Sequence, residues 1–117
     1  MGKSARVYRN LDVDETGVAA IAVPCKLVGY YVYNSNASAR SLKLYDKQAA
    51  PTVGTNTPKL TIPIPGSSGA NAFDPDGLAE FENGLGVGAT TAVGDSDTGA
   101  PGSNEVVVNL LWKPIGR

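Results

Sequence analysis

Apolar and polar side chains alternate along much of the chain, and a period of two is typical of β-strands that bury one face. In residues 59–65, Leu60, Ile62 and Ile64 share one face and are separated by polar residues or proline. The two prolines of this segment have no N–H to donate to a neighbouring strand. The segment is therefore predicted to be a strand at a sheet edge or at a bulge.

Two further segments show the same alternation. Residues 41–45 place Leu42 and Leu44 inward and Lys43 outward. Residues 105–113 place four apolar side chains on one face and polar residues on the other. The apolar residues of this second segment are Val106, Val108, Leu110 and Trp112. Both segments are predicted to be strands with one face toward the core.

Residues 26–33 are apolar on both faces, as expected of a strand in the middle of a sheet or covered on both sides. Shorter strand candidates are residues 5–9, 17–23, 78–81 and 85–93. About eight strands separated by turn residues predict an all-β fold, a single-domain antiparallel β-sandwich that is jelly-roll-like.

This β-sandwich domain is expected to cover residues 11–117, and residues 1–10 are expected to form an N-terminal arm. Helix is limited to at most one turn within residues 76–83, because that segment is short and ends in glycine. The longest loops are expected at residues 48–58, 65–76 and 94–104.

Composition narrows the function. The 117 residues are 42% apolar and 18% charged, which suits one small domain with its own core. No apolar run approaches the ~18 residues of a membrane span, and no signal peptide is expected. Histidine is absent and Cys25 is the only cysteine, which excludes an internal disulfide, a Cys/His metal site and imidazole catalysis. We expect no enzymatic activity and no cofactor.

The first nine residues contain three cations, Lys3, Arg6 and Arg9. Three cations neutralise few phosphates, and the whole chain has a net charge of −1, so nucleic-acid binding is not expected. These residues are predicted to anchor the chain to a protein neighbour. The alternative interpretation is a solvated terminal tail.

Glycine alternates with apolar residues at Gly84, Gly86 and Gly88. A strand with this pattern has a core face and an outer face without side chains, which lets another chain approach closely. The three glycines are therefore predicted partner-binding residues. The alternative is a bulged or sharply bent strand.

Two loops carry paired carboxylates, Asp74 with Asp76 and Asp95 with Asp97. Oxygen ligands at this spacing suit calcium, but neither loop continues with further ligands, and aspartate is a common turn residue. No metal site is therefore predicted. The sequon formed by residues 36–38 is read as a turn.

Several aromatic side chains have two interpretations, because amphipathic rings stack on sugars and also fill the core or its rim. These residues are Tyr30, Tyr31, Tyr33, Tyr45 and Trp112. Cys25 begins the most apolar segment and is predicted to be a buried, unreactive thiol.

Five segments, in order along the chain, resemble a group of small virion proteins of tailed bacteriophages. They are YNSNASARSLKLYDK (33–47), PTVGT (51–55), LTIPIP (60–65), NGLG (83–86) and EVVVN (105–109). The resemblance implies a jelly-roll-like sandwich that decorates or cements the capsid, often as a trimer, with no catalytic residues. The expected partners are the major capsid protein and further copies of the chain, and the expected location is the capsid surface of a virion made in the host bacterial cytoplasm.

Two functions follow as expectations. The first is a capsid decoration or cement protein that stabilises the head shell through protein–protein contacts, without binding nucleic acid or membrane. The alternative is a carbohydrate- or host-receptor-binding β-domain of a fibre or tail component, which the tyrosines and turn-rich loops favour.

Overall fold

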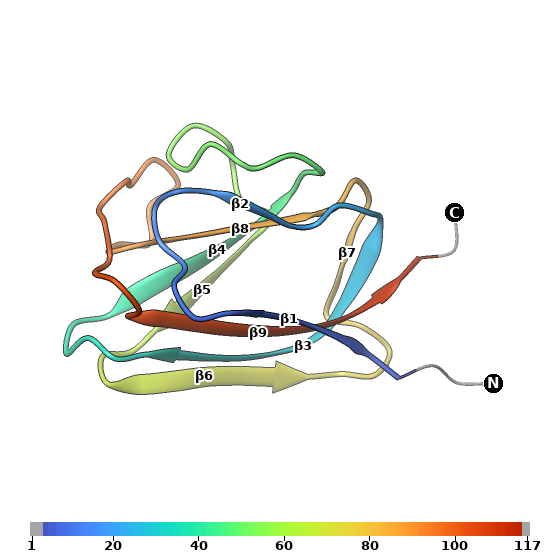
Figure 1. Ribbon diagram of the computed structural model, residues 1–117, viewed down its shortest axis with the longest axis horizontal. Coiled ribbons are helices and arrows are strands. Elements are labelled where there is room, and N and C mark those ends of the chain that lie inside the picture. The colour runs from blue at the N-terminus through green and yellow to red at the C-terminus, as the bar shows by residue number, and fades with distance from the viewer. Residues whose placement is uncertain (1–3, 116–117) are drawn as a thin grey trace.

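Nine strands form two antiparallel sheets in the computed structural model, which describes residues 4–115 and contains no helix among them (Figure 1). Sheet A has the strand order β1-β9-β3-β6, with the short β7 also paired to β3. Sheet B has the order β2-β8-β4-β5. The strands are β1 Arg6–Asn10, β2 Val18–Ile21, β3 Cys25–Asn34, β4 Arg40–Asp46, β5 Leu60–Ile64, β6 Ser68–Phe73, β7 Ala79–Phe81, β8 Leu85–Thr90 and β9 Val106–Pro114.

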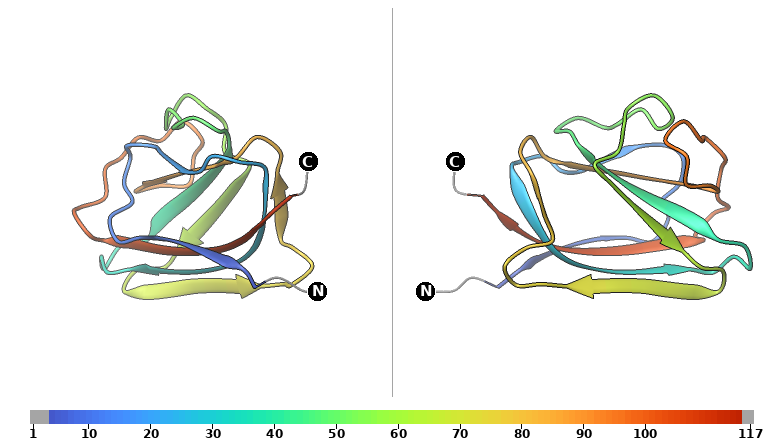
Figure 2. Two further views of the ribbon diagram at one scale, coloured as in Figure 1. Left: turned by 45° about the vertical axis from the view of Figure 1, so that its right-hand side comes forward. Right: turned by 180° about the vertical axis from the view of Figure 1, so that it is seen from behind.

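The strand pairs are nested. Strand β1 pairs with β9, β2 with β8, β3 with β6, and β4 with β5, so the first half of the chain pairs with the second half in reverse order. Figure 2 shows the two sheets as separate layers, with β9 running between β1 and β3. The predicted all-β, two-sheet architecture is confirmed, with nine strands instead of about eight.

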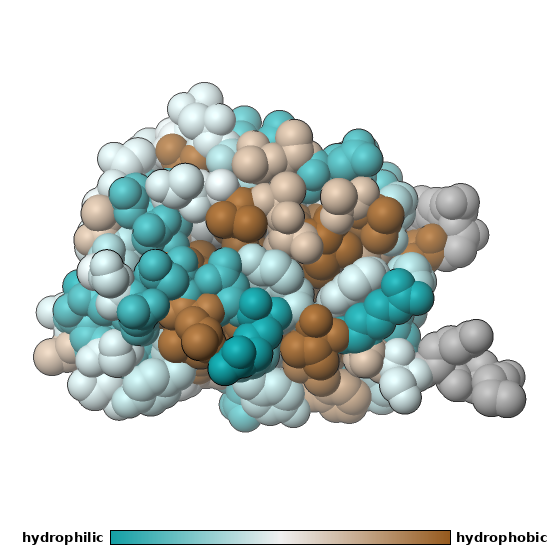
Figure 3. Space-filling view, viewed as in Figure 1, coloured by the Kyte–Doolittle hydropathy of each residue, from teal (hydrophilic) through white to brown (hydrophobic). Residues whose placement is uncertain are grey.

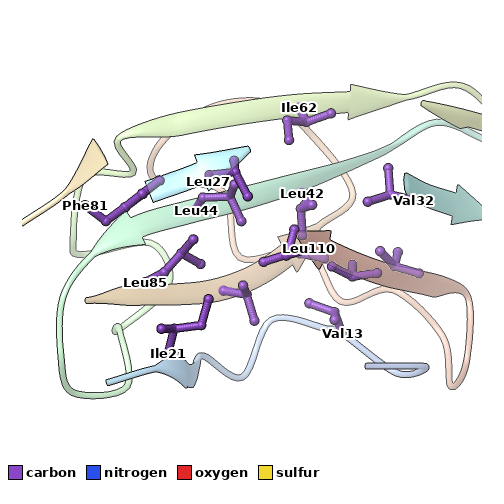
Figure 4. Close-up of a cluster of buried hydrophobic side chains, with 14 of the residues drawn as sticks. Val13, Ile21, Leu27, Val32, Leu42, Leu44, Ile62, Phe81, Leu85 and Leu110 are labelled. Atoms are coloured by element: carbon purple, nitrogen blue, oxygen red, sulfur yellow. The ribbon is translucent and has the colours of Figure 1, made fainter. Parts of the chain in front are cut away.

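One core lies between the sheets, and the predicted inward faces supply it. Leu42, Leu44 and Ile62 reach it from sheet B, and Leu110 reaches it from sheet A (Figure 4). Val108 of sheet A also belongs to this core. Each fully buried side chain of this size contributes roughly 1.5–3 kcal/mol relative to exposure. Cys25 is also fully buried here, as predicted. Its burial and, to a lesser extent, the negative charge of Asp46 raise the pKa of the thiol to about 11. At neutral pH the thiol is therefore protonated, which agrees with the prediction that it is unreactive.

Lys43 lies on the outward face of β4, as predicted, but that face is not open to solvent. Its side chain is fully buried, on the face opposite Leu42 and Leu44. The loops at residues 47–59 and 91–105 fold over this outer face of sheet B (Figure 2). The Lys43 Nζ donates a hydrogen bond to the carbonyl of Gly94 in the second loop. Alternation predicts the face of a strand but not what covers it.

Strand β6 lies within the segment predicted as a loop. Its residues are small or polar apart from Phe73, so they give little hydrophobic signal. Strand β1 lies within the predicted N-terminal arm, and it pairs along its whole length with β9. Residues 6–10 are therefore part of sheet A instead of a separate arm.

Strand β3 is central, between β9 and β6, as predicted. It is not covered on both faces along its whole length. Tyr31 and Tyr33 remain 45% and 46% exposed on the face turned away from the core. Within residues 4–115, no loop covers this outer face of sheet A as the loops at residues 47–59 and 91–105 cover sheet B (Figure 2).

Candidate binding surfaces

The basic residues of the N-terminal segment do not act as one cluster. Arg6 lies opposite Trp112 on β9, and its guanidinium stacks 5.3 Å from the centre of the indole ring. Arg9 points to the other face of sheet A, because residues three apart on a strand face opposite sides. Lys3 lies outside the described residues. The structure thus separates Arg6 from Arg9.

A hollow of about 390 Å³ lies where β1 begins and β9 ends. Ser4, Arg6, Lys113 and Pro114 line it, so its lining within residues 4–115 has two cations and no carboxylate. The antiparallel pairing of β1 with β9 brings Arg6 and Lys113 together from opposite ends of the sequence. Their positions in the sequence do not connect them, because only the register of β1 with β9 places them at the same hollow. An anionic group fits this hollow by charge.

The glycine face of β8 exists, but it is not open to a partner. Gly84, Gly86 and Gly88 are buried. A Cβ atom at Gly86 would lie 2.7 Å from Pro51 Cδ, and one at Gly88 would lie 2.6 Å from Val53 Cγ2. The close approach predicted for another chain is therefore made by this chain's own loop.

The outer face of sheet A carries a shallow groove of about 380 Å³ across β3, β6 and β9. Its lining includes the two exposed tyrosines, Tyr31 and Tyr33, and the amides of Asn71 and Asn109. The predicted aromatic set is thus divided, because Tyr45 is fully buried and Tyr30 packs against the core. Figure 3 shows apolar and hydrophilic patches side by side at the level of β1 and β9.

The paired aspartates form turns. Asp74 Oδ1 accepts a hydrogen bond from the backbone N–H of Asp76, and Asp97 Oδ2 accepts from those of Ala92 and Gly99. Desolvation raises the pKa of Asp97, but these backbone hydrogen bonds outweigh it and leave the pKa lowered. Within residues 4–115, no group of three side chains suits a metal ion.

One polar cluster was missed by sequence analysis. Arg40 Nε lies 3.0 Å from Glu105 Oε1, and Asn36 Nδ2 donates to Glu105 Oε2 at 2.8 Å. The hydrogen bond from Asn36, together with that from the Gly102 N–H, lowers the pKa of Glu105. Asn36 also accepts from the Ser38 N–H, which confirms the predicted turn. The cluster ties the β3–β4 turn to the start of β9.

The fold and these surfaces define an all-β protein of two packed antiparallel sheets, with one sheet covered by its own loops and the other bare. No protein-family model, no curated protein and no solved structure matches the chain. Among the residues described, no helix is long and apolar enough to cross a membrane.

Proposed function

We propose that this chain is a virion structural protein of a tailed bacteriophage, which decorates and cements the head shell by contacts with the major capsid protein. It acts on the capsid surface as a homo-oligomer, with a trimer favoured, after synthesis in the host bacterial cytoplasm. The proposal rests on the resemblance of five segments to small phage virion proteins and on the hollow lined by Arg6 and Lys113.

The proposed architecture is a jelly roll. A jelly roll is an eight-stranded pair of sheets with Greek-key connections. Without β7, the nested pairs leave eight strands in two four-stranded sheets, β1-β9-β3-β6 and β2-β8-β4-β5. This order supports a jelly roll, in which four strands pair with four later strands like a long folded hairpin. Successive pairs then lie in alternate sheets: β1 with β9 and β3 with β6 in sheet A, and β2 with β8 and β4 with β5 in sheet B.

The Arg6–Lys113 hollow is the observation that carries the proposal. Two cations held on adjacent strands, with no carboxylate among the described lining residues, attract an acidic segment of a neighbouring protein. The stacking of Arg6 on Trp112 holds one of these cations in place before binding. Weak contacts of this kind stabilise a shell because many copies engage at once.

Self-association is supported by the free edges of sheet A. Among the described strands, β1 pairs only with β9, and β6 only with β3. The short β7 pairs with residues 25–27 of β3 on the side opposite β9, so it lies along the same edge as β6. The order of the sheet makes β1 and β6 antiparallel, so β6 of one copy can extend the sheet onto β1 of the next. Strand β6 carries no charge and no proline, the usual protections of an edge. Head-to-tail pairing of this kind closes into a ring when the rotation between copies divides a full turn evenly, as it does in a trimer.

The test uses phage particles from which the protein has been stripped. Stripping lowers the temperature at which the particles release DNA, and adding back the purified protein restores it. The charge-reversal variants Arg6→Glu and Lys113→Glu weaken co-sedimentation with stripped particles at least tenfold. The matched control is Lys47→Glu, which reverses a lysine near Asp46 and Asn83, outside the hollow.

Circular dichroism melting shows whether each variant is folded. Particle stability that is unchanged by stripping contradicts cementing. Equal binding of folded Arg6→Glu, Lys113→Glu and wild-type protein contradicts the assigned hollow.

A further inference from the structure

The outer face of sheet A is ordered in three rows of side chains that cross its strands. In the middle row Arg9, Asn109, Tyr31 and Asn71 lie opposite one another in register. One flanking row is apolar and the other contains a second tyrosine. The flanking rows are Val7, Leu111, Gly29 and Phe73, and Val107, Tyr33 and Gly69.

The groove described above runs over the middle row and the Tyr33 row. Tyr31 and Tyr33 are about half exposed, and Gly69 opposite Tyr33 adds no side chain to obstruct the ring. Exposed rings beside an open volume offer flat apolar surfaces to a ligand that is itself partly apolar. At about 380 Å³ the groove lies at the lower end of the range of small-ligand sites.

Polar groups flank Tyr31 on both sides. Asn71 lies on one neighbouring strand and Asn109 on the other, each directly opposite Tyr31. Asn109 Nδ2 donates at 3.2 Å to the Tyr31 carbonyl, which fixes the amide and leaves its oxygen and second N–H to a ligand. A ring to stack on, with amides at either side, matches a pyranose, which has apolar faces and hydroxyl groups around its rim.

The charge carried by these rows narrows the class of ligand further. Arg9, at the end of the middle row, is the only charged residue in the three rows. No carboxylate within residues 4–115 forms an ion pair with it. A guanidinium without an ion-pair partner, in line with an aromatic ring and two amides, favours a ligand that carries a carboxylate.

We propose that this groove binds an acidic oligosaccharide, with a pyranose ring packed on Tyr31, hydroxyl groups bonded to Asn71 and Asn109, and a sugar carboxylate directed to Arg9. The site goes beyond the proposed function, because a capsid protein that assembles through sheet edges keeps this face free. A virion that displays it would adhere to acidic surface glycans.

A second copy of the chain fits this face less well. Three rows across four strands span roughly 400 Å² in projection, whereas a stable protein interface needs about 800 Å² from each partner. The polar middle row also crosses the centre of the face, where protein interfaces are most apolar. A small polar ligand is the better match.

The test is a glycan array that contains neutral oligosaccharides and oligosaccharides with uronic or sialic acid, followed by calorimetric titration of the acidic compounds that bind. Tyr31→Ala weakens binding at least tenfold, and Tyr31→Trp retains it. Arg9→Gln weakens binding of an acidic sugar about tenfold but leaves binding of its neutral methyl ester unchanged. The matched controls are Val93→Ala and Lys47→Gln, which change an exposed apolar residue and a cation outside the groove.

Three results overturn the assignment, provided that melting curves show folded variants. The first is no binding of any sugar at millimolar concentration. The second is equal binding by Tyr31→Ala and wild type. The third is self-association that Tyr31→Ala abolishes, which identifies the face as a protein interface. Particle stability is measured separately, so failure here is distinguishable from failure of the cementing function.

Discussion

Asn34 and Tyr45 are both fully buried, but they differ in how their polar atoms are satisfied. Asn34 Nδ2 donates to the carbonyls of Ser38, at 2.8 Å, and Pro65, at 3.2 Å. Its Oδ1 accepts from the Asn36 N–H at 2.9 Å. The Tyr45 hydroxyl finds no hydrogen-bond partner among the described residues. Burial of Asn34 therefore organises two turns, whereas burial of the tyrosine hydroxyl costs stability.

This difference predicts that substitutions at the two residues change the free energy of unfolding in different directions. Tyr45→Phe removes only the unsatisfied hydroxyl, so the free energy of unfolding is unchanged or rises by up to about 1 kcal/mol. Urea denaturation followed by tryptophan fluorescence measures the change. Asn34→Leu, in the same titration, lowers the free energy of unfolding by about 2 kcal/mol, because it leaves buried carbonyls unpaired. A clear loss of stability in Tyr45→Phe would show that the hydroxyl has a partner.

At the scale of the element, the glycines of β8 leave room for large side chains on β4 and for a loop that packs over the strand. Gly86 and Gly88 lie opposite Tyr45 and Lys43 on β4, so the bare positions of one strand accommodate the two largest buried side chains of the other. The loop at residues 47–59 then packs Pro51 and Val53 directly onto the backbone of β8. The glycines allow a third layer over sheet B.

Gly88→Ala is expected to destabilise the protein by about 1–3 kcal/mol, because the added methyl group overlaps Val53 in a packed site. Thermal unfolding by calorimetry measures the effect. Gly94→Ala is the matched control, since a Cβ there meets no atom within 4 Å. Val53→Ala combined with Gly88→Ala recovers part of the loss. Equal stability of Gly88→Ala and Gly94→Ala would contradict this packing.

The elements that sequence predicted best are those with large alternating side chains, such as β5 and β9. Strand β6 was missed because Gly69, Ala70 and Ala72 carry almost no hydrophobic signal, and the sheet supplies their structure through pairing with β3. Only part of the groove could be predicted from the sequence. The tyrosines suggested sugar stacking, but Asn71 and Asn109 are far apart in the sequence, and only the strand register places both of them opposite Tyr31. Burial of Lys43 depends on loops, whose paths no alternation predicts.

At the scale of the whole molecule, carboxylates whose pKa is lowered link stability to pH; beside Asp97, these are Asp46 and Glu105. Desolvation raises the pKa of Asp46, but hydrogen bonds from the Asn83 and Glu82 N–H groups outweigh it and lower the pKa. The hydrogen bond from Asn36 lowers the pKa of Glu105. Asp46, at the end of β4, accepts a hydrogen bond from the N–H of Asn83 in the β7–β8 turn. Glu105, just before β9, accepts one from Asn36 in the β3–β4 turn. Each carboxylate therefore holds a turn against another part of the chain.

A carboxyl whose pKa is lower in the folded state stabilises the fold fully above its unfolded value, and loses this contribution as pH falls through its folded value. The melting temperature should therefore fall as pH drops below the ordinary values of 3.8 for Asp46 and 4.5 for Glu105. Glu105→Gln melts at a lower temperature at pH 7 but with a shallower pH dependence. An unchanged slope in this variant would contradict the role of Glu105.

Strand β9 has a consequence for how the protein is made. It lies between β1 and β3, and its residues follow every other strand in the sequence. On the ribosome, β1 and β3 emerge early but have no neighbour in common until Val106–Pro114 leaves the exit tunnel. Sheet A therefore closes only after β9 has been made, and nascent chains stalled before residue 106 expose both strands to chaperones and to one another.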